Sequence, residues 1–474
     1  MTLTAAQILS IDPATEEVTA RFDAFTPEQA DAKVREAHAA FLGWREKSFA
    51  ERAAPTRDLA VLLRERKERY AALMTLEMGK PITQARAEVE KCAWNADFYA
   101  QNAERFLGDE PIATNARSSF VRYEPLGVVL AVMPWNYPFW QVIRFAAPAL
   151  MAGNAAVLKH ASNVPRSALA LEELFRDAGF PDGLFGTVLL AGGAVEPLIA
   201  DDRVKAVTLT GSSITGERIA AAAGRHLKKV VLELGGSDPF IVLDDADIDA
   251  AAATGVTART QNNGQSCIAA KRFIVEAGAA AAFEKKLGAA FEALVVGDPK
   301  DDRTQVGPLA RGDLRETLER QVRESVRMGA RVVTGGKRLD RRGYFYEPTL
   351  LADVTPEMPV LAEETFGPAA ALVRARDADD AVRIANATPY GLGSSLWTRD
   401  EALARRLAQR IDAGSVFVNS MVFSDPRLPF GGVKQSGYGR ELSAHGIREF
   451  TNVKTVWLGP ATGPQMPQIE APAE

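Results

Sequence analysis

Cysteine and histidine are both scarce in this chain of 474 residues, which has two cysteines and four histidines. Two cysteines cannot build a disulfide framework, so we expect a reducing compartment, the cytoplasm. The histidines are scattered along the chain without the spacing of zinc ligands, so no metal site is predicted.

Long apolar runs and a surplus of positive charge are missing as well. No apolar run approaches the length of a membrane span, and the opening MTLTAAQILSIDP lacks the basic and apolar parts of a secretory signal. The net charge of −5 leaves no basic excess to neutralise phosphates. We therefore expect a protein that binds neither membranes nor nucleic acids.

The composition that remains is that of an ordinary soluble protein. Hydrophobic residues make up 47% and charged residues 25% of the chain. Because 474 residues exceed what one hydrophobic core usually organises, two or three domains are expected.

The order of the predicted elements indicates an α/β fold. The first hundred residues show amphipathic helical patterns at about 27–46, 50–78 and 82–107, the first opened by a capping box at Thr26. From Ser118 onward, apolar strands such as AAVLK, VKAVTLT and KKVVLEL alternate with helices. This alternation predicts a parallel, doubly wound sheet. Residues 460–474, rich in proline, are expected to form a flexible tail.

One of the two cysteines, Cys267, lies in a polar loop that reads QNNGQSCIAAK. Lys271 and Arg272 follow closely and could favour the thiolate. The local sequence leaves open whether Cys267 is a reactive thiol or an ordinary small apolar residue. Cys92 lies within a predicted helix and is expected to be a buried structural thiol.

Polar residues follow three of the predicted parallel strands. AAVLK ends at Lys159 and is followed by Ser162, a glycine-flanked loop with Gly211 and Ser212 follows VKAVTLT, and KKVVLEL holds Glu233. Ligands bind at the carboxyl ends of such strands. The loop matches neither common phosphate motif, so a plain strand-to-helix turn is an equally good interpretation of it. Glu233 is expected to face Cys267 across a cleft between domains.

Seven motifs, in order along nearly the whole chain, resemble those of the aldehyde dehydrogenase superfamily. They are PWNYP at 134–138, KHASNVP at 159–165, TGSSITG at 210–216, LELGG at 232–236, GQSC at 264–267, EETFGP at 363–368 and LPFGGVKQSGYGRE at 428–441. Within that superfamily the chain is most similar to succinate-semialdehyde dehydrogenases, through KHASNVP and NSMVFSDPRLPFGG at 419–432.

The resemblance implies a fold with three parts. A Rossmann-type cofactor domain would comprise 1–107 and 127–235, and an α/β catalytic domain would comprise 236–450. A small β oligomerisation arm would comprise 108–126 and 451–459. Members of the superfamily are usually homodimers or homotetramers, so the resemblance implies a homo-oligomer.

The resemblance also implies roles for individual residues. The catalytic positions are the nucleophile Cys267, the general base Glu233 and the oxyanion donor Asn136. A thiolate would attack the aldehyde, hydride would pass to the nicotinamide, and Glu233 would activate water to hydrolyse the thioester. The implied cofactor contacts are Trp135, Lys159, Ser162, Gly211, Ser212, Glu364 and Phe366.

Ser162 bears on the choice of cofactor. Many members of the superfamily carry a glutamate at this position, where it binds the adenine ribose and would repel a 2′-phosphate. Ser162 and Lys159 offer a hydroxyl group and a cation instead. NADP is therefore expected to be preferred, with NAD also used.

Arg144 and Ser424 bear on the choice of substrate. Arg144 lies in an apolar helix-like run, where the sequence by itself favours a partner for a buried carboxylate. In succinate-semialdehyde dehydrogenases the matching arginine and serine bind the distal carboxylate of the aldehyde. The expected substrate is a small-molecule aldehyde, succinic semialdehyde first, glutaric semialdehyde or a general aliphatic aldehyde next.

Three alternatives to this function remain open at the level of sequence. A cysteine hydrolase without nicotinamide would usually pair the thiol with histidine, and no histidine lies near Cys267 in sequence. A catalytically silent member would not be expected to keep all of the catalytic positions. An acylating, CoA-dependent relative would usually lack the general base that Glu233 supplies.

Overall fold

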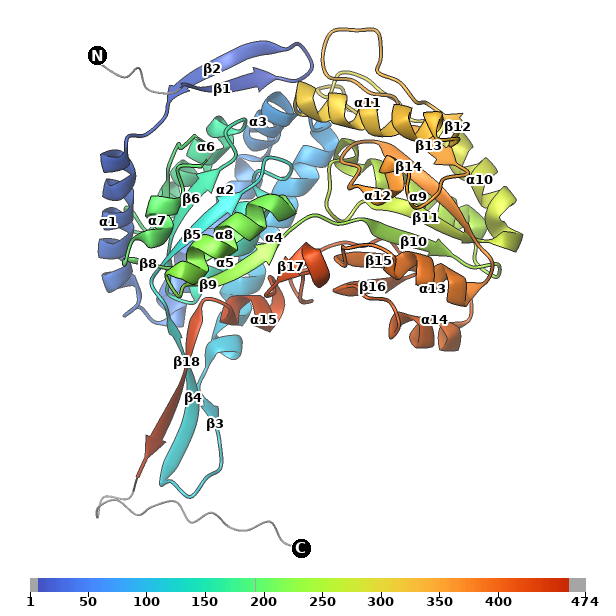
Figure 1. Cartoon of the computed structure of the whole chain (residues 1–474). Helices are drawn as coiled ribbons and strands as arrows, with labels where there is room; N and C mark the ends of the chain where they lie inside the picture. The colour runs from blue at the N-terminus through green and yellow to red at the C-terminus, as the bar shows by residue number, and fades with distance from the viewer. Residues whose placement is uncertain (1–6, 192, 460–474) are drawn as a thin grey trace, which may run out of the picture.

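The computed structural model describes residues 7–191 and 193–459 and contains two large sheets, each covered by helices (Figure 1). The first sheet is formed mainly by the N-terminal half and the second by the C-terminal half. The fold class is the α/β fold expected from the sequence. In both sheets most strands run parallel, and strands alternate with helices along the chain.

Six strands form the first sheet, in the order β17-β9-β8-β5-β6-β7. The five strands from β9 to β7 run parallel, and only β17 is antiparallel to its neighbour. Their bounds are β5 Val128–Met133, β6 Ala155–His160, β7 Phe185–Thr187, β8 Val204–Thr210, β9 Lys229–Glu233 and β17 Gly437–Tyr438. Because β5 is buried along its whole length, this sheet is the centre of the larger core.

Helices cover both faces of this sheet. The capping box at Thr26 is present and opens α1, as expected. The expected helix at 50–78 is instead two helices, because the backbone leaves the helical region at Arg66. The helices are α1 Pro27–Trp44, α2 Phe49–Glu65, α3 Lys67–Met78, α4 Ile82–Leu107, α5 Trp140–Met151, α6 Pro165–Asp177, α7 Glu196–Ala200 and α8 Ser213–Arg225.

Seven strands form the second sheet, in the order β12-β13-β14-β11-β10-β15-β16. Their bounds are β10 Asp238–Val242, β11 Ala270–Glu276, β12 Arg331–Thr334, β13 Thr349–Ala352, β14 Ala369–Ala375, β15 Gly393–Trp397 and β16 Ser415–Val418. The helices that follow in this half of the chain are α9 Ile248–Thr260, η1 Gln261–Gly264, α10 Ala277–Glu292, α11 Gly312–Arg327, α12 Pro359–Ala362, α13 Ala378–Asn386, α14 Glu401–Ala408 and η2 Lys434–Ser436. The last helix, α15 Ser443–Arg448, packs against α4 and α5 beside the first sheet.

The chain passes between the two sheets twice. It leaves the first sheet after β9 and enters the second at β10, near the expected boundary at Gly235. It then returns earlier than the expected end of a catalytic domain at 450. Strand β17 pairs with β9, and Leu442, Ile447 and Phe450 pack into the core of the first sheet.

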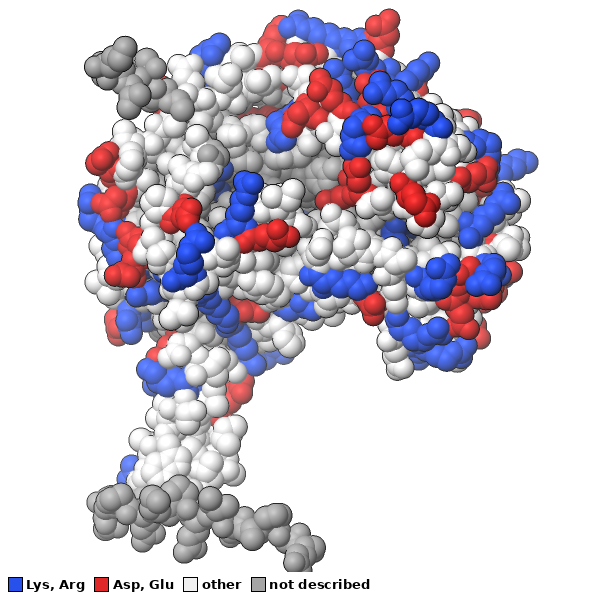
Figure 2. Space-filling view, in the orientation of Figure 1, with Lys and Arg blue, Asp and Glu red and all other residues white. Residues whose placement is uncertain are grey.

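A third sheet forms an extension below the body of the molecule (Figure 1). It has the order β18-β4-β3, with bounds β3 Glu110–Pro111, β4 Ser118–Pro125 and β18 Thr451–Leu458. These strands fall within the two segments expected to form the arm. The extension is mostly uncharged in Figure 2, whereas both signs of charge are interspersed over the rest of this face.

An N-terminal hairpin was not expected from the sequence. It pairs β1 Gln7–Asp12 with β2 Glu17–Asp23 and lies near α3 and α6. The expected flexible tail at 460–474 lies outside the described residues.

Candidate active site

The carboxyl ends of four parallel strands carry most of the predicted site residues. Trp135 and Asn136 follow β5, Lys159 lies near the end of β6, Gly211 and Ser212 follow β8, and Glu233 ends β9. Since β9, β8, β5 and β6 are adjacent and parallel, these segments share one edge of the sheet. This edge is where the chain crosses from the first sheet to the second.

The loop that carries Cys267 is held by a strained and well-bonded turn. Asn262 and Asn263 adopt left-handed backbone angles, with φ of 56° and 58°, a region that asparagine tolerates better than most residues. The Asn262 amide donates to the Asn136 and Gln265 carbonyls, and the Asn263 amide donates to the Gly79 and Pro308 carbonyls. These contacts tie the loop to the end of β5 and to the loop after α3.

One cavity, of about 420 Å³, opens beside this loop. We call it the Trp135 cavity. Cys267, Glu364 and Phe366 lie in its wall with the start of α8, and the Trp135 and Phe366 rings meet edge to face at 5.7 Å. Its lining residues are Pro134, Trp135, Asn136, Gln141, Thr210, Gly211, Ser212, Thr215, Leu234, Gly235, Cys267, Arg311, Leu314, Glu364 and Phe366.

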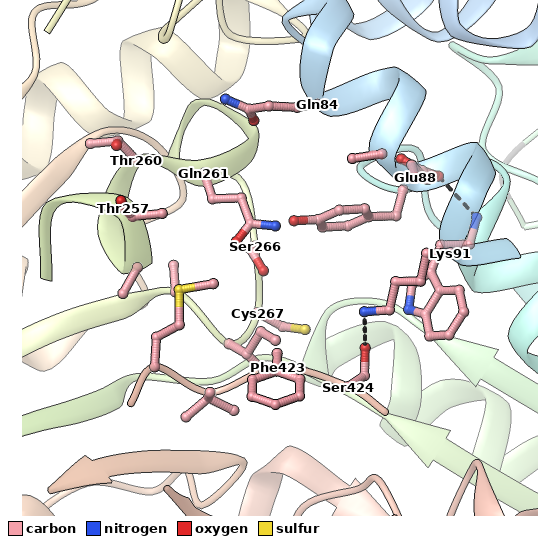
Figure 3. A pocket seen from close by; sticks show the side chains of 18 of the residues that line it. Gln84, Glu88, Lys91, Thr257, Thr260, Gln261, Ser266, Cys267, Phe423 and Ser424 are labelled. Carbon is pink, nitrogen blue, oxygen red and sulfur yellow. Dashed lines mark hydrogen bonds between the residues drawn. The ribbon is translucent and has the colours of Figure 1, made fainter. Parts of the chain in front are cut away.

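A second cavity, of about 480 Å³, opens on the other part of the loop (Figure 3). We call it the Lys91 cavity. Its wall combines aromatic rings with two cations, Lys91 and Arg144, and with the Ser424 hydroxyl group. Cys267 and Gln141 line both cavities. A thiol at this junction can meet one molecule from each cavity.

The Cys267 thiol is half-buried, and burial raises its pKa to about 12. The nearby Lys271 and Arg144 cations act in the opposite direction, and Lys271 has the larger effect. The expectation that Lys271 favours the thiolate therefore has the right sign, but the effect of burial on the pKa is larger. The raised pKa favours the protonated thiol at neutral pH.

The Asn136 side chain lies next to the nucleophile loop. Its amide nitrogen donates to the Gln265 carbonyl at 3.0 Å, two residues before Cys267. The Gln141 amide contacts the Asn136 oxygen at 3.5 Å and so keeps the amide nitrogen on the loop side. In the described part of the chain, the Cys267 backbone N–H has no acceptor. Two N–H donors are thus available near the sulfur.

The Glu233 side chain is buried and lines neither cavity. Its two oxygens have no hydrogen-bond partner among the described residues. Burial and the nearby Glu441 carboxylate raise its pKa well above the ordinary value, whereas Arg144 and Arg440 oppose this rise. Burial therefore favours the protonated form of Glu233, whose side chain is set back from the thiol.

Lys271 links the loop that carries Cys267 to Gly236 and Glu364. Its ammonium group donates to the Gly236 and Cys267 carbonyls, at 2.5 and 2.8 Å, and pairs with Glu364 at 2.9 Å. Glu364 also accepts the Gly236 N–H at 3.1 Å. This buried lysine fixes the nucleophile loop against the Glu364 carboxylate.

Two predicted cofactor contacts lie outside the Trp135 cavity. Lys159 is half-buried near the end of β6, and burial lowers its pKa. Ser162 is exposed in a separate hollow of about 280 Å³ that it shares with Asn163, Ala191 and the β1 residues Gln7, Ile8 and Leu9. Lys159 is the last residue but one of β6 and Ser162 follows the strand, so both lie at the same sheet edge as the Trp135 cavity.

Arg144 and Ser424 both line the Lys91 cavity, but each has a protein partner. Arg144 is buried, pairs with Glu441 and donates to Gln141 at 2.9 Å. This is the carboxylate partner that its sequence context favoured. Ser424 accepts a hydrogen bond from Lys91 at 2.7 Å (Figure 3).

Lys91 and Gln141 are site residues that the sequence reasoning missed. Gln84, Ala87, Glu88 and Lys91 line the cavity from α4 and are spaced at i, i+3, i+4 and i+7, which is one helical face. Polar residues repeated on one face of a helix were the available signal.

No helix of the described residues is long and apolar enough to cross a membrane.

Comparison with known proteins gives consistent matches over nearly the whole chain. Residues 2–456 match the model of the "Aldehyde dehydrogenase family". A protein of Mycobacterium tuberculosis H37Rv named succinate-semialdehyde dehydrogenase (NADP(+)) 1 is 54% identical, over 95% of this chain and 99% of its own length. A probable succinate-semialdehyde dehydrogenase (NADP(+)) of Synechocystis is 52% identical, with the same coverage.

The fold is also similar to solved structures. One is succinic semialdehyde dehydrogenase of Streptococcus pyogenes, determined in complex with NADP+. It has a TM-score of 0.93 and 38% identity and covers 96% of this chain and 100% of its own.

Proposed function

Because the chain belongs to the aldehyde dehydrogenase family, we propose that it oxidises a short aldehyde with a distal carboxylate to the corresponding acid, with NADP+ as the hydride acceptor. Succinic semialdehyde, which gives succinate, is the first candidate substrate. The relatives named for this aldehyde and for NADP(+) support the choice, at 52–54% identity.

A single observation carries this proposal: Cys267 lies in the wall of two cavities of different chemistry. The Trp135 cavity suits a dinucleotide, because it combines aromatic rings, the Glu364 carboxylate and the N-terminus of α8, where backbone N–H groups favour phosphate. The Lys91 cavity suits an anionic aldehyde, because two cations line it. Both have volumes typical of small-molecule sites.

The first part of the reaction depends on Cys267 and Asn136. Once deprotonated, the Cys267 sulfur attacks the aldehyde carbon and forms a thiohemiacetal with a negatively charged oxygen. The Asn136 amide and the Cys267 backbone N–H stabilise that oxygen by hydrogen bonding. Bound NADP+ supplies the acceptor for the hydride that leaves this carbon, and a thioester on Cys267 results.

Hydrolysis of the thioester depends on Glu233. Because burial and the nearby Glu441 raise the pKa of Glu233, its protonated form is favoured at rest, and this proton must first pass to solvent. The Glu233 carboxylate then accepts a proton from the attacking water. Since it lines neither cavity at rest, its side chain must turn toward Cys267 for this step. The water then attacks the thioester, and the free thiol and the carboxylic acid are released.

Other functions receive less support from the site. None of the four histidines lines either cavity, so a cysteine hydrolase would lack its usual base. The presence of Glu233 disfavours an acylating, CoA-dependent reaction. A cytoplasmic location and assembly into a homodimer or homotetramer are further parts of the proposal.

The decisive experiment is an aldehyde panel assayed with each dinucleotide at 340 nm. Succinic semialdehyde, glutaric semialdehyde, butanal and hexanal would each be tested with NADP+ and NAD+, using wild type and Cys267→Ser. We expect the highest kcat/KM for succinic semialdehyde with NADP+, and no turnover by the serine variant. A higher value for butanal would reject the proposed substrate class.

A further inference from the structure

Lys91 is a cation in the Lys91 cavity without a carboxylate partner. Its ammonium group donates to the Ser424 hydroxyl at 2.7 Å and lies 4.3 Å from the centre of the Trp140 ring. Among the described residues no carboxylate forms an ion pair with it. The neighbouring Glu88 is already occupied by Lys80 and by the Phe139 and Trp140 N–H groups.

A second cation lies in the wall of the same cavity with part of its hydrogen-bonding capacity unused. The Arg144 Nε atom faces Glu441, and one terminal nitrogen donates to Gln141 and Thr210. The other terminal nitrogen has no partner among the described residues. The charge of Arg144 is compensated by Glu441, whereas that of Lys91 is not.

We propose that Lys91 supplies the uncompensated charge that binds the distal carboxylate of the substrate, with Ser424 and the free nitrogen of Arg144 beside it. This inference rests on the proposed oxidation of a carboxylated aldehyde. An anion placed there satisfies the spare N–H groups of Lys91 and separates two mutually repelling cations. An aldehyde without a carboxylate leaves those groups unpaired.

The charges around Lys91 agree with this role. Burial, and to a smaller extent the Arg144 cation on α5, lower the pKa of Lys91 to about 8. Glu88 and Cys92 on α4 itself and Asp425 on the loop after β16 act in the opposite direction. A carboxylate bound in the cavity would stabilise the protonated amine, so binding is expected to weaken as pH rises through 8.

The test compares succinic semialdehyde with butanal, which has the same carbon chain and no carboxylate. Lys91→Met keeps an unbranched side chain, one atom shorter, and removes the charge. We expect kcat/KM for succinic semialdehyde to fall by about 10- to 100-fold, the loss of one charge-assisted hydrogen-bonded contact, while butanal is unaffected. Lys91→Arg should restore most of the loss.

A matched control is Lys67→Met, which removes a lysine of α3 that pairs with Glu90 of α4 and lines neither cavity. It should change neither substrate. If Lys91→Met lowered kcat/KM equally for both aldehydes, Lys91 would have a structural role and the inference would be overturned. An unchanged ratio of the two kcat/KM values would overturn it as well. A wild type that prefers butanal would instead overturn the proposed substrate class.

The pH dependence supplies an independent readout. In wild type, the ratio of kcat/KM for succinic semialdehyde to that for butanal should decline above about pH 8, as Lys91 loses its proton. In Lys91→Arg the ratio should stay level to higher pH, because arginine remains charged. The same decline in both proteins would refute the assignment of this titration to Lys91.

Discussion

Burial of the Glu233 carboxyl group beside Glu441 costs the folded protein free energy once the pH permits ionisation. The pKa of Glu233 is raised above its ordinary value, so the folded state holds a proton that the unfolded chain has already lost. The contribution of the protonated Glu233 to the stability of the folded state is complete below the pKa of the unfolded chain, near 4.5. This contribution is lost as the pH rises through the pKa of the folded state. An uncharged residue of the same shape avoids this loss.

We therefore expect Glu233→Gln to be inactive in steady-state turnover but more stable than wild type at neutral pH. The gain in melting temperature should be clear at pH 8 and should shrink toward pH 5. Glu217→Gln, an exposed change on α8, serves as the control and should show no such trend. A gain independent of pH would contradict the sign worked out for Glu233.

Ser162 provides a second test on a single residue. Replacing it with glutamate places a carboxylate where a 2′-phosphate is proposed to bind. We expect kcat/KM with NADP+ to fall by at least about 10-fold while the value with NAD+ is kept or rises, since like charges at close range repel. A strong preference for NAD+ in wild type, unaltered by the change, would refute the proposed role of Ser162.

The sequence could nominate candidate site residues that lie within contiguous motifs, whose roles stay predictions, but not those whose position depends on packing. Cys267, Asn136, Glu364 and Phe366 belong to short motifs, and the structure places all four around one cavity. Lys91 belongs to no motif. Its role depends on how α4 packs against α5, about 50 residues later, and that contact is set by both helices.

At the scale of elements, the turn before Cys267 makes a glycine necessary. Gly264 has φ of 71°, and a Cβ atom there would lie 2.4 Å from the Gly367 carbonyl group. Gly179, at the end of α6, has a similar φ of 86° but open space around it. The two positions share the backbone strain and differ in the steric clash.

Alanine substitution at these two glycines should separate the two effects. Gly179→Ala is expected to cost about 1–2 kcal/mol from the left-handed backbone alone. Gly264→Ala should cost more and should also slow alkylation of Cys267 or abolish activity, because the turn must shift. Thermal melts and iodoacetamide kinetics measure both. Equal effects at the two sites would show that the loop can absorb the added methyl group.

Local sequence patterns predicted most elements but not their breaks. Strand β8 matches VKAVTLT along its full length, because it is buried and bounded by a clear turn. The division between α2 and α3 at Arg66 was missed, since the apolar repeat continues across it while the backbone does not. The hairpin β1–β2 was missed too: its second strand has no buried residue and little apolar periodicity.

For the whole molecule, the extension of β3, β4 and β18 leaves apolar side chains in solvent. On β18, Val453 is 61% exposed, Trp457 is 43% exposed and Leu458 is 41% exposed. A three-stranded sheet standing away from the body has little core of its own. Another copy of the chain would cover these side chains, in line with the proposed homo-oligomer.

Charges placed on this sheet should disrupt such an assembly. We expect Val453→Glu with Trp457→Glu to lower the mass measured by light scattering to that of a single chain. Leu42→Glu, at an equally exposed apolar residue on α1, should leave the mass unchanged. A wild type that is already monomeric, or a double variant of unchanged mass, would argue against this interface.

The return of residues 437–450 to the first sheet could not be predicted from local sequence patterns. Strand β17 lies about 200 residues from its partner β9, and the pairing rests on two residue pairs. No local pattern specifies so short a strand. The return brings Glu441 to Arg144, and the segment just before it places Gly431 close to Glu233. The environment of the proposed base is therefore assembled by the last part of the chain.

The shared position of Cys267 between two cavities has a consequence for inhibition. An unreactive dicarboxylic acid that fills the Lys91 cavity does not occupy the space proposed for the dinucleotide. Such an acid should raise the apparent KM for the aldehyde without changing that for NADP+, and the two reactants should be able to arrive in either order. Inhibitors that bind the Lys91 cavity or the Trp135 cavity would then act independently of each other. Either kind would protect the Cys267 sulfur from alkylation.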